Sequence, residues 1–372
     1  MVMDMGGSML TQYRLPEPQQ EHFERIGIDY KRETSYDIEK ERHISNQNRN
    51  LLNEEQRIVH DSFVASALSA TSSIFFLDAP GECGKTFLIQ TILATIRSQN
   101  KIVIATASSG LAATLLSAGR TIHSTYKVPL NLTNVDQPIC SIKKGTSLER
   151  LIKECCAIVI DEAPMTNKLV FKALHRSLCD ITGKNEPMGG IATLLCGEFR
   201  QILPVVVVGT RANIVNSCIK SSMLWSCITP LQLRTNMRVY LSGSTEAGIF
   251  ADMLLRLGDG LIPATENPDT IPLHQFGIIV QTTKQLIDSV FPDFVNNISN
   301  AQWLTERAIL TPLNDTALKI NFEMMQNIPG NSMVYLSIDT TVTGEKSVHY
   351  PTEFLNSIEV AGLSSHKLCQ SW

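Results

Sequence analysis

Residues 78–86 combine the side chains and glycines that hold a phosphate group. The stretch reads Asp-Ala-Pro-Gly-Glu-Cys-Gly-Lys-Thr and lies between a strand-like apolar run and a helix-like run. In such a loop the backbone N–H groups and the helix start face the phosphates. Lys85 supplies a positive charge and Thr86 offers its hydroxyl to Mg²⁺. The stretch therefore predicts a phosphate-binding loop.

The match to the pattern GxxxxGK[ST] is irregular at two positions. Ala79 occupies the first glycine position, and Glu82 places a carboxylate beside the expected phosphates. A carboxylate there is unfavourable unless it points outward. The other interpretation is a Gly-Lys-Thr that occurs by chance at a helix start. The strand before the loop and the helix after it favour phosphate binding.

Two carboxylates, Asp161 and Glu162, end another apolar run, AIVID. In an ATPase, Asp161 would hold Mg²⁺, and Glu162 would orient and deprotonate the attacking water. Two carboxylates after a strand are as often a helix N-cap. Their position about 75 residues after the phosphate loop favours the ATPase interpretation.

Three further side chains could read a nucleotide, and each has an ordinary structural alternative. Gln201, in GEFRQILP, could sense a γ-phosphate or simply follow a strand. Gln56, in LNEEQ, could contact an adenine edge, although a surface glutamine on a helix is the better explanation of that residue alone. Arg238, in Asn-Met-Arg, could sense a phosphate or sit at a solvated helix end.

Two small, polar, glycine-bearing stretches occupy residues 107–113 and 119–124. The first contains Ser109 and Gly110, and the second contains His123 and Ser124. Loops of this kind let backbone amides and hydroxyls approach phosphates closely.

The elements that position these residues follow from near-continuous apolar runs, which are typical of strands buried on both faces. Strands are expected at 74–78, 102–106, 157–161 and 192–196. Helices are expected between them, at 85–98 and 168–180. Strands that alternate with helices predict an α/β domain with a mainly parallel sheet. Farther on, the sequence predicts a loop over 258–272, a strand at 307–312 and a helix at 314–327.

The length of 372 residues predicts about two domains, and the net charge of −4 argues against a uniformly basic nucleic-acid coat. The charge is unevenly distributed. Residues 51–240 carry 19 basic and 13 acidic side chains, whereas residues 241–372 carry 6 and 14. The basic block suggests an anionic partner, and chance asymmetry explains it equally well.

The nine cysteines form no CxxC pair and no cluster with zinc-ligand spacing. Buried, reduced thiols are expected, which suggests the cytosol or nucleus. The N-terminus lacks the pattern of a secretory signal, and no uncharged stretch has the composition of a membrane span. We therefore expect an intracellular protein with no membrane partner. Nothing in the sequence indicates an oligomeric state.

Taken together and in this order, the motifs resemble those of the PIF (petite integration frequency) family of superfamily 1 DNA helicases. The branch associated with Helitron-type transposons is the most similar. The resemblance covers most of the chain from about Tyr36 onward, and GEFRQILPV with TNMRV is its most specific part. The matching stretches are LNEEQ (52–56), APGECGKTFL (79–88), TASSGLAATLL (106–116), GRTIHS (119–124), VIDEAPM (159–165), GEFRQILPV (197–205), TNMRV (235–239), FADMLLRLGDG (250–260), RAILTPLN (307–314) and YPTEFLNS (350–357).

The resemblance implies an α/β fold: a RecA-like P-loop NTPase domain with a parallel sheet, followed by an incomplete second RecA-like domain. It implies ATP-driven, 5′-to-3′ translocation on single-stranded DNA, with unwinding at duplex junctions. ATP and Mg²⁺ would be the cofactors. The expected location is the nucleus, with mitochondria as a second location. The domains would be a polar flank (1–50), the first RecA-like domain (51–240) and part of the second (241–372).

The resemblance also assigns roles by position. Lys85, Glu162, Gln201 and Arg238 would be catalytic, with Gln201 and Arg238 at the γ-phosphate. Thr86 and Asp161 would bind Mg²⁺. The nucleotide would contact Gln56, Gly81, Glu82, Cys83, Gly84, Lys85 and Thr86. Ser109, Gly110, His123 and Ser124 would lie on or near the DNA track.

The chain departs from the family pattern at three places. The family has Gly-Gly-Thr where this chain has Gly81-Glu82-Cys83, and Asp where it has Glu198. A DNA-contacting motif and an arginine finger, expected later in the second domain, have no counterpart in the sequence. We therefore expect a truncated product or a degenerate transposon copy. Two alternatives stay open: a non-catalytic nucleotide- or DNA-binding remnant, and a P-loop ATPase that acts on protein partners.

Overall fold

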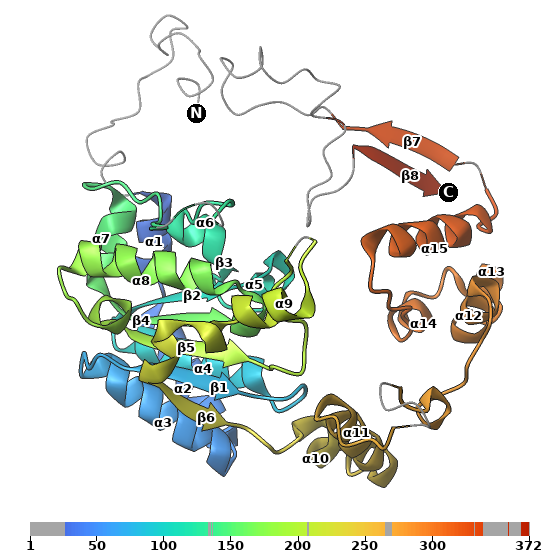
Figure 1. Cartoon of the computed structure of the whole chain (residues 1–372), viewed down its shortest axis with the longest axis horizontal. Helices are drawn as coiled ribbons and strands as arrows, with labels where there is room; N and C mark the ends of the chain where they lie inside the picture. The colour runs from blue at the N-terminus through green and yellow to red at the C-terminus, as the bar shows by residue number, and fades with distance from the viewer. Residues whose placement is uncertain are drawn as a thin grey trace, which may run out of the picture. The chain divides into compact units, whose positions relative to one another are not determined.

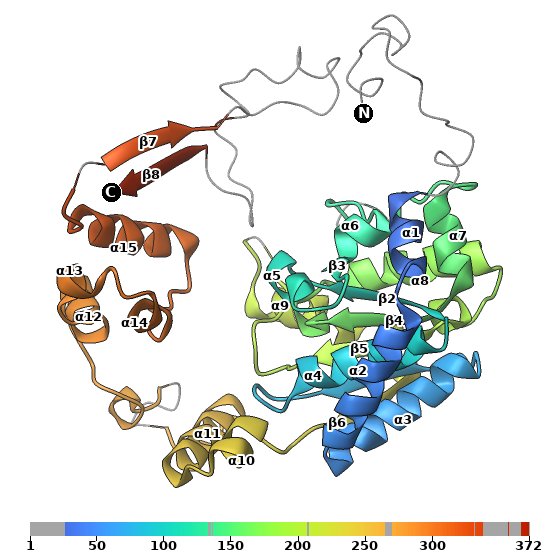
Figure 2. The ribbon, with the colours of Figure 1, turned by 180° about the vertical axis from the view of Figure 1, so that it is seen from behind.

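The computed structural model describes residues 27–132, 135, 137–206, 208–264, 270–330, 332–337, 356 and 366–371. The chain divides into two compact units, one ending at Leu261 and the other continuing from Ile262. Figure 1 and Figure 2 show the chain from opposite sides. The YPTEFLNS match lies outside the described residues except for Asn356.

The first unit is built on a six-stranded sheet with the order β3-β2-β4-β5-β1-β6, in which every neighbouring pair is parallel. The strands are β1 (Ile74–Asp78), β2 (Ile102–Ala107), β3 (Arg120–Thr121), β4 (Cys155–Asp161), β5 (Ala192–Gly197) and β6 (Ile228–Gln232). The predicted α/β fold with a parallel sheet is confirmed. The edge strands β3 and β6 were not predicted.

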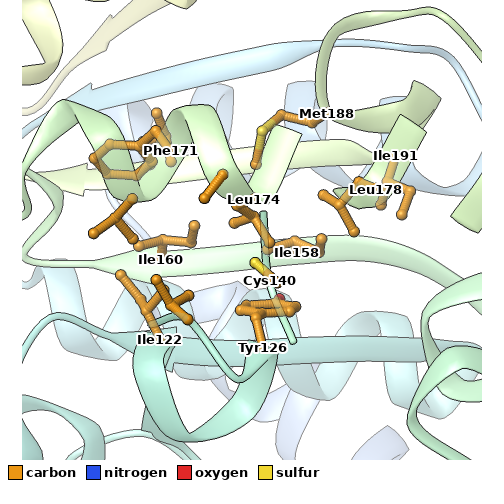
Figure 3. Packing of buried hydrophobic residues seen from close by; sticks show 14 of the residues in the cluster. Ile122, Tyr126, Cys140, Ile158, Ile160, Phe171, Leu174, Leu178, Met188 and Ile191 are labelled. Carbon is orange, nitrogen blue, oxygen red and sulfur yellow. The ribbon is translucent and has the colours of Figure 1, made fainter. Parts of the chain in front are cut away.

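Both faces of the sheet are covered because alternate side chains of each strand point to opposite faces. Ile158 and Ile160 of β4 pack in one cluster with the helices α6, α7 and α8, and Figure 3 shows part of it. Val159 packs in the other cluster, with α3 and α4. These helices are α3 (Glu54–Leu68), α4 (Lys85–Ser98), α6 (Ile122–Tyr126), α7 (Ser147–Glu154) and α8 (Lys168–Thr182).

Within the expected polar flank (1–50), the structure forms helices from Ile28 onward, and residues 1–26 lie outside the described residues. Two helices, α1 (Ile28–Thr34) and α2 (Ile38–Leu51), belong to the first unit. Buried Glu33 of α1 pairs with Arg97 of α4 at 3.5 Å. The Arg97 guanidinium also lies 4.0 Å from the ring centre of Tyr36. A few anchoring contacts therefore dock a mostly polar segment.

The first unit also extends past the predicted boundary at residue 240. Past this boundary it includes the end of α10 (Met237–Ser242) and α11 (Thr245–Gly258). Its remaining helices are α5 (Gly110–Thr114) and α9 (Arg211–Ser217). Short 3₁₀ helices lie at Ala163–Met165, Pro187–Gly190, Ile219–Ser221 and Met223–Cys227. Arg200 Nε donates to Asp259 Oδ1 at 2.7 Å, which ties the end of α11 to the loop after β5. This ion pair is one contact between the residues after 240 and the rest of the first unit.

The second unit contains four helices and a two-stranded antiparallel sheet among its described residues. They are α12 (Thr283–Val290), α13 (Phe294–Asn297), α14 (Ala301–Thr305), α15 (Asn314–Gln326), β7 (Ser332–Leu336) and β8 (Lys367–Ser371), with a 3₁₀ turn at Leu273–Gln275. The helix at 314–327 is confirmed, but the strand at 307–312 is wrong. Arg307 instead follows the end of α14, where its guanidinium donates to the Trp303 carbonyl and lies 4.4 Å from that ring centre.

Cysteine usage agrees with reduced thiols. The eight cysteines whose side chains are described are all free, and Cys83, Cys140, Cys155, Cys196 and Cys218 are buried. In the described part of the chain, none of the helices has both the length and the apolar character needed to cross a bilayer.

Candidate functional site

The predicted phosphate loop connects β1 to α4 at the carboxyl edge of the sheet. Asp78 is the last residue of β1, and Lys85 is the first of α4. Gly84 adopts a left-handed conformation (φ 75°), and a Cβ there would lie 2.6 Å from Gln56 Nε2. Glycine is therefore required at this position. No side chain among the described residues caps α4, so its first N–H groups remain available to an anion.

Lys85 lies between the two carboxylates that follow β4. Its Nζ is 2.8 Å from Asp161 Oδ1 and also pairs with Glu162 Oε1. Burial lowers the pKa of Lys85, but the two carboxylates outweigh burial and hold that pKa above its ordinary value. The structure thus brings together Lys85, Asp161 and Glu162, which the sequence had predicted to share one site.

Glu162 adopts an uncommon backbone conformation at this edge. Its φ and ψ are 52° and 39°, in the left-handed region that costs a side-chain-bearing residue about 1–2 kcal/mol. Its Oε2 is buried and has no hydrogen-bond partner among the described residues. A strained residue with an unpartnered oxygen is typical of a functional site rather than of a structural cap.

The loop after β5 approaches the phosphate loop from the side. Glu198 Oε2 accepts hydrogen bonds from the Gly81 backbone N–H at 3.2 Å and from Gln201 Nε2 at 3.1 Å. Gly197, with φ 154°, lets the end of β5 lie against the turn after β4, because a Cβ there would lie 2.3 Å from Pro164 Cδ. Gln201 therefore contacts the phosphate loop through Glu198.

Arg238 also reaches the phosphate loop. Its Nη1 lies 2.6 Å from Glu82 Oε1, so the carboxylate that was unexpected in the sequence has a cation partner. A cavity of about 630 Å³ separates the loop from α11. It is lined by Gly81 and Glu82 from the loop, by Gln201 and by Arg238.

Gln56 lies beneath the loop rather than on an open surface, so its interpretation as a surface glutamine is wrong. It is 1% exposed, and its Nε2 donates to the Cys83 carbonyl at 3.0 Å. Its Oε1 accepts from the Asn53 backbone N–H, as part of the capping box of α3. Each end of the amide thus has a protein partner, and the predicted adenine contact stays a prediction. Cys83 is buried, and burial raises its thiol pKa to about 11.

Part of the predicted DNA track forms a second cavity, of about 530 Å³. Ser109, the N-cap of α5, and His123, on α6, both line it. Burial lowers the pKa of His123, which keeps the ring neutral near pH 7. Gly110 and Ser124 are exposed and do not line this cavity.

Three more residues of this second cavity were not singled out from the sequence: Met165, Asn167 and Val205. Met165 and Val205 end two of the motifs quoted above, VIDEAPM and GEFRQILPV. Asn167 is the N-cap of α8 and accepts a hydrogen bond from the Leu169 N–H. Its position immediately before an apolar-periodic helix was the signal that could have identified it.

A family model for PIF1-like helicases matches residues 51–268. Among curated proteins, the ATP-dependent DNA helicase RRM3 of Saccharomyces cerevisiae is 30% identical over 169 residues, which is 45% of this chain and 23% of that protein. The ATP-dependent DNA helicase PIF1 of Xenopus laevis is 28% identical over 167 residues, covering 45% and 25%. The uncharacterized protein 030L of Invertebrate iridescent virus 6 is 31% identical over 166 residues, covering 44% and 31%.

Solved structures show the same likeness. Pif1 helicase from Candida albicans has a TM-score of 0.59 and 25% identity, over 86% of this chain and 63% of that one. Bacteroides Pif1 in complex with ADP-AlF4 has a TM-score of 0.51 at 16% identity, a likeness of fold, over 86% and 64%. The chain spans about a quarter to a third of the length of the curated relatives it matches. The chain belongs to the PIF1-like helicase family.

Proposed function

We propose that this chain carries the ATPase machinery of a DNA helicase. In this proposal it hydrolyses Mg·ATP and moves 5′ to 3′ along single-stranded DNA, unwinding duplex at junctions. Membership of the PIF1-like helicase family supports this, as do the relatives named ATP-dependent DNA helicases. The observation that carries the proposal is the placement of Lys85 between Asp161 and Glu162.

The residues of the loop suit a nucleotide phosphate. α4 has no side-chain cap among the described residues, and a Cβ at Gly81 would meet no atom within 4 Å. Thr86 and Asp161 offer a hydroxyl and a carboxylate, which are the oxygen ligands that Mg²⁺ prefers. Bound Mg²⁺ would neutralise charge on the β- and γ-phosphates.

In the hydrolysis of ATP, each side chain of the site would have a separate role. Lys85 would turn from the two carboxylates to the phosphates, where its ammonium offsets their charge. Glu162 would orient a water toward the γ-phosphorus and accept its proton on Oε2, as the bond from phosphorus to the β,γ-bridging oxygen breaks. Gln201 and Arg238 would contact the γ-phosphate from the cavity beside the loop.

For the DNA, we propose the edge of the sheet that carries Ser109, Gly110, His123 and Ser124. The support is the second cavity, in which neutral His123 lies with the Ser109 hydroxyl and apolar side chains of Met165 and Val205. A mixed polar and apolar cavity suits a stacked base with a backbone hydrogen bond.

Two wider expectations also stay proposals. The part after Leu261 would begin the second helicase domain; the match to Candida albicans Pif1 covers 86% of this chain, more than the first unit contains. The protein would act in the nucleus, with mitochondria as a second location, where its DNA substrate is found.

A non-catalytic nucleotide-binding role is the second candidate, because two groups that a phosphate would use already have carboxylate partners. Arg238 pairs with Glu82, and the Gly81 N–H donates to Glu198. ATP hydrolysis by the 372-residue chain, measured with and without single-stranded DNA, separates the two. We expect DNA-stimulated turnover that Glu162→Gln removes. Turnover equal to that of Glu162→Gln, with Mg·ATP still bound, would support the non-catalytic role.

DNA binding is tested separately by fluorescence anisotropy of a labelled single strand across salt concentrations. We expect the affinity to fall as salt rises, because phosphate contacts release counterions. Absence of binding, or binding with no salt dependence, would contradict the DNA-binding part of the proposal and favour an ATPase that acts on protein partners.

A further inference from the structure

Glu82 is joined to the segment 236–238 by three contacts. Its carboxylate pairs with Arg238 Nη1 at 2.6 Å and accepts a hydrogen bond from Asn236 Nδ2 at 3.4 Å. Its backbone carbonyl accepts from the Met237 N–H at 2.9 Å. One residue of the phosphate loop therefore contributes three of the contacts that hold the start of α10, and with it Arg238.

The backbone at Glu82 is costly for a residue with a side chain. Its φ is 70°, in the left-handed region that glycine adopts freely. Glutamate is disfavoured in this conformation, and in it the Glu82 carboxylate reaches Arg238.

Arg238 forms its ion pair with Glu82. Within the described ranges, Glu82 is the one acidic side chain at ion-pair distance from its guanidinium. The other charged side chains that line the same cavity are the cations Arg200 and Arg234 and the carboxylate of Glu198, which pairs with Arg200 at 3.5 Å. An anion entering this cavity would therefore compete with Glu82 for Arg238.

We propose that the ion pair between Glu82 and Arg238, called the latch below, sets the preference of the site for nucleoside triphosphate over diphosphate. The inference rests on the proposed function, in which Arg238 contacts the γ-phosphate. A triphosphate must exchange the carboxylate of Glu82 for its own γ-phosphate, whereas a diphosphate leaves the ion pair intact. The latch weakens triphosphate binding selectively.

The exposure of the pair sets the size of the effect. The side chains of Arg238 and Glu82 are 76% and 36% exposed, and ion pairs as exposed as this contribute little. We therefore expect release of the latch to strengthen triphosphate binding by about two- to fivefold, with no change for diphosphate.

The test is a double-mutant cycle on the full chain, read as the Kd of Mg·ATPγS and of Mg·ADP by titration calorimetry. Glu82→Gln should tighten Mg·ATPγS about two- to fivefold and leave Mg·ADP unchanged. In an Arg238→Gln background, the same substitution should have no effect on either ligand. An equal effect in both backgrounds would show simple repulsion between Glu82 and the phosphates and would overturn the latch.

Two further variants keep the result clear. Glu82→Gly removes the ion pair and the backbone strain together, and it should tighten Mg·ATPγS at least as much as Glu82→Gln. Glu39→Gln removes the same charge from another exposed pair, with Arg42 on α2, and should change neither Kd. If Mg·ATPγS binds in a way that depends on Lys85 but the cycle shows no coupling between Glu82 and Arg238, the latch is overturned and the proposed function is not. Absence of binding would overturn the proposed function as well.

Discussion

Replacing Lys85 with alanine tests the central ion-pair arrangement. The substitution removes one ammonium and leaves two neighbouring carboxylates without their cation; the side chains of Asp161 and Glu162 are only 3% and 19% exposed. Removing one partner of a buried pair costs about 3–5 kcal/mol. Because Lys85 keeps 13% exposure and some solvent screening, we expect the free energy of unfolding to fall by about 2–4 kcal/mol.

The pH dependence of this loss is fixed by the direction of the pKa shift. The two carboxylates outweigh burial, so the pKa of Lys85 lies above its ordinary 10.5 in the folded protein. A raised folded pKa gives stability that is fully present below the unfolded pKa and is lost as pH rises through the folded pKa. The difference in the free energy of unfolding between the wild type and Lys85→Ala has a part that comes from the Lys85 charge. That part should stay constant from about pH 6 to 9 and shrink only above about 10.5.

Urea unfolding followed by circular dichroism measures the effect. Lys153→Ala is the matched control, because Lys153 pairs with Glu149 on the surface of α7 and its loss should shift the midpoint far less. Equal midpoints for Lys85→Ala and Lys153→Ala would refute the reasoning about the buried pairs. Lys85→Ala should also weaken Mg·ATP binding and abolish turnover, so unchanged binding by calorimetry would contradict the proposed role of Lys85.

Three further predictions concern the site and its support. Glu162→Gln should keep Mg·ATP binding within about threefold and lower turnover by ~10²-fold or more, because an amide cannot accept the proton from water; normal phosphate release would contradict this. Arg97→Met should lower the free energy of unfolding by about 3–5 kcal/mol at pH 7, since Glu33 is left buried and unpaired. Burial raises the pKa of Glu33 despite the opposing Arg97 charge, so this loss should shrink in urea unfolding as pH falls and the carboxyl is protonated; a loss that does not vary with pH would contradict it. Removing Mg²⁺ with EDTA should weaken ATP binding by at least about tenfold. Without Mg²⁺, buried Asp161 is left with no cation when Lys85 turns to the phosphates. Equal Kd values with and without EDTA would argue against that exchange.

The central strands could be predicted from the sequence because they are buried on both faces. β1 spans the predicted 74–78, and α4 spans the predicted 85–98. Burial on both faces produces an uninterrupted apolar run, which is a local signal. The edge strands carry no such signal. β3 has two residues, and β6 contains Pro230 and is partly exposed along its length.

The docking of α1 and α2 could not be predicted because it depends on pairs that are distant in sequence. Their composition is polar, and their attachment rests on buried Glu33 with Arg97 and on Ser45 Oγ, 2.7 Å from Thr95 Oγ1. The strand predicted at 307–312 is absent, because these residues lie between α14 and α15 without joining a sheet. Composition describes a segment, but partners elsewhere decide its structure.

The same distinction holds at the candidate site. The phosphate loop and the carboxylates after β4 were predicted, because the chemistry of each is written in a few consecutive residues. The pairing of Glu82 with Arg238 and of Glu198 with the Gly81 N–H joins residues more than a hundred positions apart. Only the fold brings those groups together.

These pairings change how the binding of a phosphate must be understood. Lys85 is held by Asp161 and Glu162, and Arg238 is held by Glu82, so each of these cations already has a carboxylate partner. The free energy of nucleotide binding is then a difference between two sets of ion pairs rather than the sum of new ones. Such an arrangement positions Lys85 and Arg238 before the phosphates arrive. The affinity for nucleotide then also depends on what takes the place of each cation beside its carboxylate. At Asp161 that replacement would be Mg²⁺, and at the exposed Glu82 it would be solvent.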